Sequence, residues 1–306
     1  MNYLKFLFTL IFTISSFNVF ADESKDLKQN DNDVKVENTE SAEETDTEED
    51  EKVTIESYIE ENELDSKPGF LNLLVNKEND DHFLILDTKD LNKEFIYFTY
   101  FLDAPQASGQ FGGALSDGSI LEFRKFKKDI ALYKKNTKFI FDDSNNISQS
   151  ILRNIQEAFL GRFKIEVDDE DASKVLIKVN SIFLSEMLTS ISPNIPPEYM
   201  EYVDLNVGKL DKSKTFINQV KNYEKNTTVD VVYGFFNPKP RGGSVDAVAD
   251  KRFTFAKVRH LFVEMPDDKF EPRVADQRVG YFSEKVTDLS SYDYVNAVDL
   301  INKWRL

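Results

Sequence analysis

The chain has 306 residues, a formal net charge of −17 and no cysteine. The absence of cysteine excludes disulfide bonds and thiolate ligation of zinc, so stability has to come from packing. The strong acidity argues against a nucleic-acid-binding protein, because such proteins need a basic stripe on their surface.

The first 21 residues are typical of a secretory signal peptide. Lys5 precedes a largely apolar run from Phe6 to Ile14, and Val19-Phe20-Ala21 fits the small-residue cleavage rule. We therefore predict export to the periplasm or beyond, with Asp22 as the first mature residue. The apolar run is too short for a confident membrane span. An uncleaved membrane anchor is the alternative, and no stable span is expected after cleavage.

Residues 22–52 are mostly acidic and polar, with a nearly continuous negative block from Glu43 to Glu51 and no aromatic residue. Such a segment buries too little apolar surface to offset its ordering entropy, so we predict a disordered acidic linker. A solvated spacer is the simpler interpretation, and a cation-binding tail is the alternative.

The remaining residues, 53–306, predict one β-rich domain with a possible subdivision near 190–197. Thr54–Leu64 has a helical pattern with Thr54 as N-cap, and Asn146–Leu160 is the strongest predicted helix, because its apolar residues recur at helical spacing. Alternating or apolar runs between turn signals predict strands at Phe70–Val75, His82–Leu86, Glu94–Leu102, Ser119–Lys127, Ile130–Tyr133, Lys138–Phe141, Phe163–Val167, Val175–Val179, Tyr202–Leu210, Thr215–Tyr223, Thr228–Phe236 and Arg252–Met265.

Many short strands joined by tight turns, with few helices between them, favour antiparallel sheets. The predicted fold class is α+β, mainly antiparallel β. We expect a large twisted sheet or a sandwich, with the main helix 146–160 packed on it and short helices elsewhere.

No motif for catalysis or for binding a metal or cofactor stands out. The two histidines, His82 and His260, are far apart in sequence, and neither belongs to an HExxH motif, in which two histidines one helical turn apart hold zinc. A lone histidine on an apolar strand, such as His260, is more often a core residue than a ligand. Asp168–Asp171 lacks the spacing of a calcium loop and reads as a solvated hairpin tip. We predict no catalytic, cofactor-binding or metal-binding residue, and no enzyme activity for this chain.

The segment from Pro272 to Phe282 places Arg273 and Arg278 around Asp276, and the sequence ends on an apolar stretch with Trp304 and Arg305. The strings "PRVADQRVGYF" and "INKWRL" resemble the closing segment of the N-terminal DUF5117-type domain of bacterial secreted or periplasmic zinc-dependent metalloproteases. Further similarity lies in Lys93–Pro105, Ser119–Tyr133 and Tyr202–Phe235. The resemblance covers about residues 55–306.

The resemblance implies a non-catalytic accessory or structural domain of an exported zinc metalloprotease, truncated before its catalytic domain. The zinc would belong to that missing domain, and the implied partner is a following metalloprotease catalytic domain or polypeptide. Arg273, Asp276, Arg278, Trp304 and Arg305 would form a latch between the two, because arginine pairs bidentately with carboxylates. A self-contained surface ion-pair network is the alternative for these residues. For the whole chain, the alternative is a stand-alone exported binding or structural module of unknown ligand.

Overall fold

The computed structural model describes residues 53–116, 118–141, 150, 153–241, 245–266, 273–290 and 296–302. The predicted signal peptide and acidic linker lie outside these residues. The described helices and short 3-10 turns are α1 (Ile55–Glu61), η1 (Thr88–Asp90), η2 (Gln106–Ser108), α3 (Asn180–Phe183), η3 (Pro197–Tyr202) and η4 (Lys212–Lys214). The described strands are β1 (Leu64–Lys67), β2 (Asn72–Asn76), β3 (His82–Asp87), β4 (Glu94–Asp103), β5 (Ser119–Phe126), β6 (Asp129–Lys134), β7 (Phe139–Ile140), β8 (Ala158–Asp169), β9 (Lys174–Lys178), β10 (Lys209–Leu210), β11 (Phe216–Asn222), β12 (Asn226–Phe236), β13 (Phe253–Glu264), β14 (Ser283–Asp288) and β15 (Asn296–Ile301).

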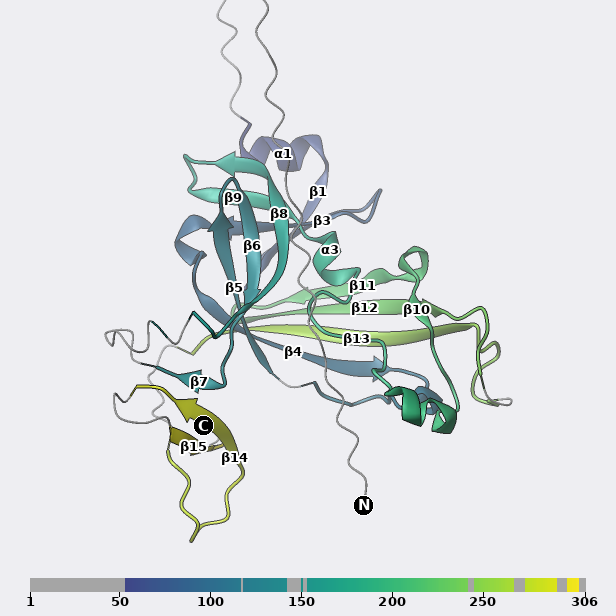
Figure 1. Ribbon diagram of the computed structural model, residues 1–306. Helices are drawn as coiled ribbons and strands as arrows, with labels where there is room; N and C mark the ends of the chain where they lie inside the picture. The colour runs from purple at the N-terminus through teal and green to yellow at the C-terminus, as the bar shows by residue number, and fades with distance from the viewer. Residues whose placement is uncertain are drawn as a thin grey trace, which may run out of the picture. The chain divides into compact units, whose positions relative to one another are not determined.

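Twelve of these strands form one sheet in the order β1-β2-β3-β9-β8-β6-β5-β4-β13-β12-β10, with β11 also paired to β12. Every pair in this sheet is antiparallel. The sheet curls, so that β5, β6 and β8 run across the direction of β12 and β13 (Figure 1). The predicted fold class, mainly antiparallel β with a large twisted sheet, is confirmed. The predicted subdivision near 190–197 stays a prediction.

The two ends of this sheet approach each other, so that it is nearly closed. The Phe70 amide, between β1 and β2, donates to the carbonyl of Tyr223 after β11 over 2.8 Å. Leu71 donates its amide to the buried hydroxyl of Thr227 over 3.0 Å, and the side-chain amide of Asn222 donates to the Lys67 carbonyl over 2.6 Å. These bonds satisfy backbone groups that an open sheet edge would leave unpaired.

The concave interior is filled by side chains from the strands and by the segment that follows β9. Strand β13 shows how the strands contribute, because its even-numbered residues from Thr254 to Phe262 are buried while Phe253 and Phe255 face outward. Helix α3 and the chain after it add Ile182, Phe183, Leu188 and Ile191, all at most 4% exposed. This arrangement follows from the period-2 alternation of a strand with one buried face.

The predicted first helix is confirmed as α1. The Thr54 hydroxyl accepts from the Ser57 amide over 3.1 Å, and the Thr54 amide donates to the Ser57 hydroxyl over 3.1 Å. This reciprocal capping box satisfies amides that have no partner within the helix. Helix α1 packs over β8 and β9, with Tyr58 edge-on to Phe83 of β3.

The predicted helix Asn146–Leu160 is wrong over its described C-terminal part. Residues 146–149, 151 and 152 lie outside the described residues, 153–155 form a turn and bend, and strand β8 begins at Ala158. Phe159, whose spacing suggested a helix, pairs with Tyr133 of β6 and packs edge-on against it. Pairing with β6, and further along with β9, sets the structure here, because cross-strand contacts can outweigh local helical spacing.

The predicted strand Tyr202–Leu210 is also largely wrong. Residues up to Tyr202 form η3, and only Lys209 and Leu210 form a strand, β10. Between them, Leu205 and Val207 are buried without belonging to a strand. Gly208 has a φ of +84°, and a Cβ there would lie 2.4 Å from the Phe236 carbonyl oxygen. The left-handed backbone that glycine permits at this close approach interrupts the strand.

A second, three-stranded sheet has the order β15-β14-β7. β14 pairs antiparallel with β15 and parallel with the two-residue β7. On the other side of β15, Val274 forms an isolated bridge with Leu300. The segment 273–275 therefore runs beside β15, held by the 2.7 Å bond from the Ala275 amide to the Asp299 carbonyl.

Candidate functional site: an acidic pocket at the end of the large sheet

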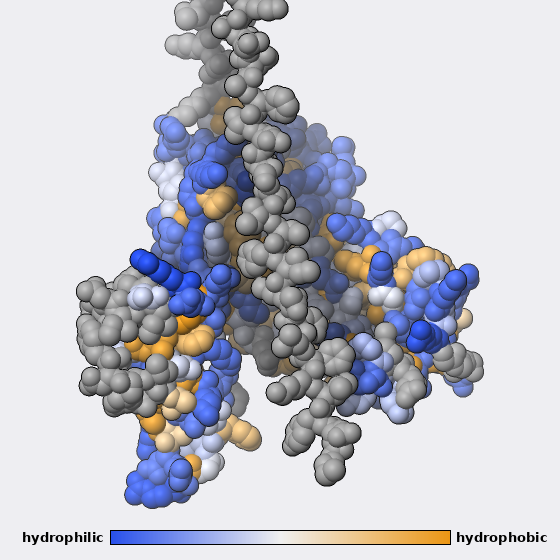
Figure 2. Space-filling view, in the orientation of Figure 1, coloured by the Kyte–Doolittle hydropathy of each residue, from blue (hydrophilic) through white to orange (hydrophobic). Residues whose placement is uncertain are grey.

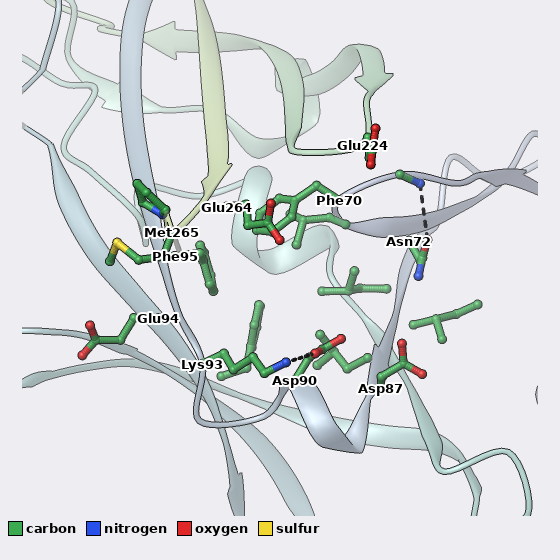
Figure 3. Close-up of a pocket in the computed structure, with 17 residues that line it drawn as sticks. Phe70, Asn72, Asp87, Asp90, Lys93, Glu94, Phe95, Glu224, Glu264 and Met265 are labelled. Carbon is green, nitrogen blue, oxygen red and sulfur yellow. Dashed lines mark hydrogen bonds and ion pairs between the residues drawn. The ribbon is translucent and has the colours of Figure 1, made fainter. Parts of the chain in front are cut away.

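A pocket of about 660 Å³ opens at one end of the large sheet. Six segments converge there: the β1–β2 connection, the end of β3 with η1, the start of β4, β5, the β11–β12 turn and the end of β13. Its size lies within the range of about 300–1,000 Å³ that is typical of ligand pockets. Figure 3 shows the side chains that surround it.

The floor of the pocket is apolar and partly aromatic. Phe95 of β4 stacks on Phe123 of β5, with ring centroids 5.7 Å apart, and Phe70 meets Phe95 edge-on at 6.3 Å. Leu84 and Leu86 of β3 complete the floor. These side chains also belong to the main hydrophobic cluster or pack against it, so the floor is rigidly supported.

The rim is acidic. Its charged residues are Asp87, Asp90, Glu94, Glu224 and Glu264 against the single cation Lys93, so five negative charges minus one positive charge leave four negative charges. Three of the carboxylates have cationic neighbours: Asp90 lies 2.7 Å from the Lys93 ammonium, Glu94 3.4 Å from Lys135, and Asp87 3.8 Å from Lys89.

Glu224 and Glu264 differ from the other rim carboxylates. Within the described residues, neither side chain has a hydrogen bond or an ion pair. The Glu264 amide donates to the carbonyl of Lys225 over 2.9 Å, which ties the end of β13 to the turn that carries Glu224. Both carboxylates lie on the side of the pocket near Phe70 (Figure 3). The pocket therefore combines an apolar floor with two exposed carboxylates that, within the described residues, form no direct ion pair.

Deeper in the same sheet, His260 of β13 is fully buried between two tyrosines. Its Nδ1 lies 2.9 Å from the Tyr97 hydroxyl and its Nε2 lies 2.8 Å from the Tyr233 hydroxyl. The Tyr233 hydroxyl donates to the Phe183 carbonyl over 2.8 Å, so it accepts from His260. Nε2 therefore carries the proton, and Nδ1 accepts from Tyr97.

Burial dominates the ionisation of this network. Desolvation lowers the pKa of His260 to about 3, and it raises the pKa values of Tyr97 and Tyr233 above their ordinary value. All three side chains are therefore neutral near pH 7. The network connects β4, β12, β13 and the last residue of α3, and every ring nitrogen and hydroxyl in it is paired. The expectation that a lone histidine on an apolar strand is a core residue is confirmed for His260.

The other histidine is also buried, at the start of β3. Its Nδ1 donates to the Asp80 carbonyl over 2.9 Å, and burial lowers the pKa of His82. In the part of the chain that the structure describes, no group of three or more His, Asp or Glu side chains is arranged to hold a metal ion. Asp168 and Asp169 end β8, and the tip of the hairpin to β9 follows them. The predicted solvation is wrong for Asp169, which is buried and accepts from the Ile55 amide over 3.1 Å.

The structure brings together part of the predicted latch. Arg278 donates to Asp276 through Nε over 2.8 Å and through its backbone amide over 3.0 Å. The Arg278 guanidinium holds the pKa of the Asp276 carboxyl down to about 2, with a smaller contribution from Arg273. The pair is local and solvent-exposed. Trp304 and Arg305 lie outside the described residues, so the latch stays a prediction.

The segment that carries this pair exposes large apolar side chains. Phe282 is 88% exposed, and Val274, Val279 and Tyr281 are each more than 40% exposed. Figure 2 shows hydrophobic side chains on the surface of this part of the molecule. Single exposed apolar residues are ordinary, but four within nine residues form a candidate contact surface.

The family described as "Domain of unknown function (DUF5117)" matches residues 112–306. The chain belongs to the DUF5117 family. No curated protein and no solved structure matches it. Among the residues that the structure describes, none of the helices has the length and apolar composition needed to cross a bilayer.

The match to the DUF5117 family begins inside the large sheet. Strands β1–β4 precede residue 112, yet they pair within the same sheet as the strands that follow it. The acidic pocket uses both parts, because Phe70, Asp87 and Phe95 precede the matched residues while Glu224 and Glu264 lie within them. The folded unit therefore extends N-terminally beyond the family match.

Sequence reasoning did not find the pocket. Asp87, Asp90 and Glu94 lie close together in the chain, but Glu224 and Glu264 come from two segments far downstream, and each carboxylate alone is an ordinary turn or strand-end residue. Phe70, Phe95 and Phe123 were predicted as strand residues, which is compatible with a buried floor but does not indicate a pocket. A weak indication of the pocket in the sequence is the clustering of Asp, Lys and Glu residues between Asp87 and Glu94.

Proposed function

We propose that this chain is a non-catalytic accessory domain of an exported zinc-dependent metalloprotease, which docks onto the catalytic polypeptide through the segment 273–282. Membership of the DUF5117 family and the resemblance of "PRVADQRVGYF" to the closing segment of such N-terminal domains support the proposal. In this proposal the zinc, its ligands and the general base all belong to the partner.

The observation that carries the proposal is the exposed apolar surface formed by Val274, Val279, Tyr281 and Phe282. Phe282 is the most exposed of these, at 88%. Arg278 and Asp276 lie in the same segment and supply charge at its edge. Apolar anchors rimmed by polar groups are typical of protein contact surfaces.

The test begins with the DNA downstream of this coding sequence, read in all frames for an HExxH motif. The encoded polypeptide is then purified and mixed with this chain, and binding is measured by calorimetry. We expect saturable binding that Phe282→Ser weakens by about tenfold or more, because a central apolar anchor contributes about 2 kcal/mol or more. Phe255→Ser is the matched control, since Phe255 is also exposed but lies on β13. Equal binding by both variants would overturn the proposed docking surface.

The second candidate function is a stand-alone exported binding module. The acidic pocket is the observation that favours it, because the pocket is complete without the segment 273–282. Absence of any HExxH sequence nearby, together with ligand binding by the isolated chain, would favour this candidate.

A further inference from the structure

We infer that the acidic pocket binds a cationic peptide segment in which an apolar side chain lies next to lysine or arginine. The inference does not depend on the proposed protease partner, because the pocket and the segment 273–282 share no residue. It rests on the pocket's size, its aromatic floor and the excess of negative charge on its rim.

The floor selects for an apolar group. Phe70 and Met265 are only half-buried and line the opening, while Phe95 and Phe123 below them are buried and fixed by stacking. A ligand side chain that displaces water from this surface gains about 25 cal/mol for each Å² of apolar area removed from water. The floor is preorganised by the core beneath it, so binding does not require it to reorder.

The rim selects for positive charge. Glu224 lies in the β11–β12 turn and Glu264 ends β13, and within the described residues neither carboxylate forms an ion pair, although Lys93 interacts with Glu264 at longer range. Two like charges above an apolar surface repel each other, and an ammonium or guanidinium group placed between them relieves that repulsion. Lys93 pairs directly with Asp90 across 2.7 Å and reaches Glu264 only at longer range, so it fills this role only in part.

Charge also argues against two other possible ligands of the pocket, the acidic segment of the same chain and a second copy of the chain. Residues 22–52 of the same chain are strongly acidic in sequence, so the rim repels them. A second copy of the chain carries a formal net charge of −17 and meets the same general repulsion. A basic segment of another polypeptide, with an apolar side chain for the floor, fits both features of the pocket.

The experiment is calorimetry of the full chain with four probes: the end-capped tripeptides Lys-Phe-Lys, Lys-Ser-Lys and Glu-Phe-Glu, and spermidine. We expect Lys-Phe-Lys to bind most tightly. Its affinity should fall as salt is raised from about 0.1 M to about 1 M, because screening shortens the range of the charge attraction. Equal affinity for Lys-Phe-Lys and Glu-Phe-Glu, tighter binding of spermidine, or no saturable binding at all would overturn the inference.

Two double variants test the location. Glu224→Gln with Glu264→Gln should weaken Lys-Phe-Lys binding about fivefold or more. Each exposed ion pair with the peptide raises the affinity by up to about fivefold, and the double variant removes both carboxylates. Glu61→Gln with Glu198→Gln removes the same charge from exposed positions outside the pocket and should leave binding unchanged. All four side chains are exposed, so neither variant endangers folding. The same loss in both variants would show that only the net charge of the chain matters and would contradict the proposed site.

Discussion

The interior of the large sheet and the segment 273–282 use the same residue types in opposite ways. Tyr97 and Tyr233 are at most 2% exposed, whereas Tyr281 and Phe282 are 58% and 88% exposed. Both regions are rich in aromatic side chains, but only the first uses them for its own stability. If the proposed docking surface is correct, the aromatic residues of the exposed segment contribute to binding rather than to the stability of this domain.

Polar groups follow the same division. In the large sheet, His260 has both ring nitrogens engaged by buried tyrosines, so removing a partner leaves a buried polar group unpaired. In the exposed segment, Asp276 and Arg278 pair across two positions of the chain and remain in contact with water. Exposed pairs of that kind contribute little to folding. Mutations in the two regions should therefore differ in size and in the property that they change.

The largest expected effect is the loss of a core aromatic side chain. Phe235 is 1% exposed within the main hydrophobic cluster, so Phe235→Ala should lower the free energy of unfolding by about 3–5 kcal/mol. Phe282→Ala removes an identical group from an exposed position and should change it by less than about 0.5 kcal/mol. Urea denaturation followed by circular dichroism measures both. A similar loss of unfolding free energy in both variants would mean that Phe282 packs within the domain. It would then not differ from the core residue Phe235 in its role.

Acid should destabilise the domain through His260. The histidine has a pKa of about 3 when folded and an ordinary value near 6.5 when unfolded. The unfolded chain therefore binds the extra proton between these values, and stability falls as the pH drops below about 6.5. The slope from this group is about 1.4 kcal/mol per pH unit until about pH 3, where it levels off. Denaturation at several pH values gives the slope.

The control for this effect is His260→Gln, which lacks the titrating ring. Its free energy of unfolding should depend less steeply on pH, by the uptake of about one proton on unfolding. His82→Gln removes the other buried histidine, and burial also lowers the pKa of His82. Direct titration by NMR offers a second readout, since the His260 ring signals should not move between pH 8 and about pH 4. A His260 that titrates near its ordinary pKa would contradict the buried network.

The two tyrosines of the network should differ when each loses its hydroxyl. Tyr233→Phe leaves two groups unpaired, the Phe183 carbonyl and the Nε2–H of His260, whereas Tyr97→Phe leaves only Nδ1 without a donor. Each unpaired buried group costs about 1–3 kcal/mol. Tyr233→Phe should therefore be the more destabilising change by thermal or urea denaturation. The reverse order would contradict the assigned tautomer, in which Nε2 carries the proton.

Local signals in the sequence predicted much of the large sheet. The N-cap Thr54 and the helical spacing after it predicted α1, and the apolar alternation in Arg252–Met265 predicted β13 with His260 as a core residue. Both signals depend only on neighbouring residues, so no knowledge of the rest of the chain is needed.

The failures share one physical cause. The apolar spacing around Phe159 fits a helix, but the structure pairs Phe159 with Tyr133, more than twenty residues earlier. The run Tyr202–Leu210 looks like a strand, but Gly208 turns the backbone away beneath Phe236. The acidic pocket depends on the closure of the sheet, which no single segment encodes. Contacts between segments that are remote in the chain decided all three, and local sequence patterns do not reveal such contacts.

The smallest expected effect concerns the Asp276–Arg278 pair. Arg278→Ala should raise the pKa of Asp276 from about 2 towards the ordinary aspartate value, although Arg273 continues to lower it. The melting temperature should stay unchanged, because the pair is exposed. Carboxyl NMR titration measures the pKa, and Asp250 is the control, since it pairs with Arg252 in the same i, i+2 geometry and should not respond. Repeating the titration with the HExxH polypeptide then distinguishes the two interpretations of this segment: a latch predicts a further change in the Asp276 pKa on binding, whereas a self-contained pair predicts none.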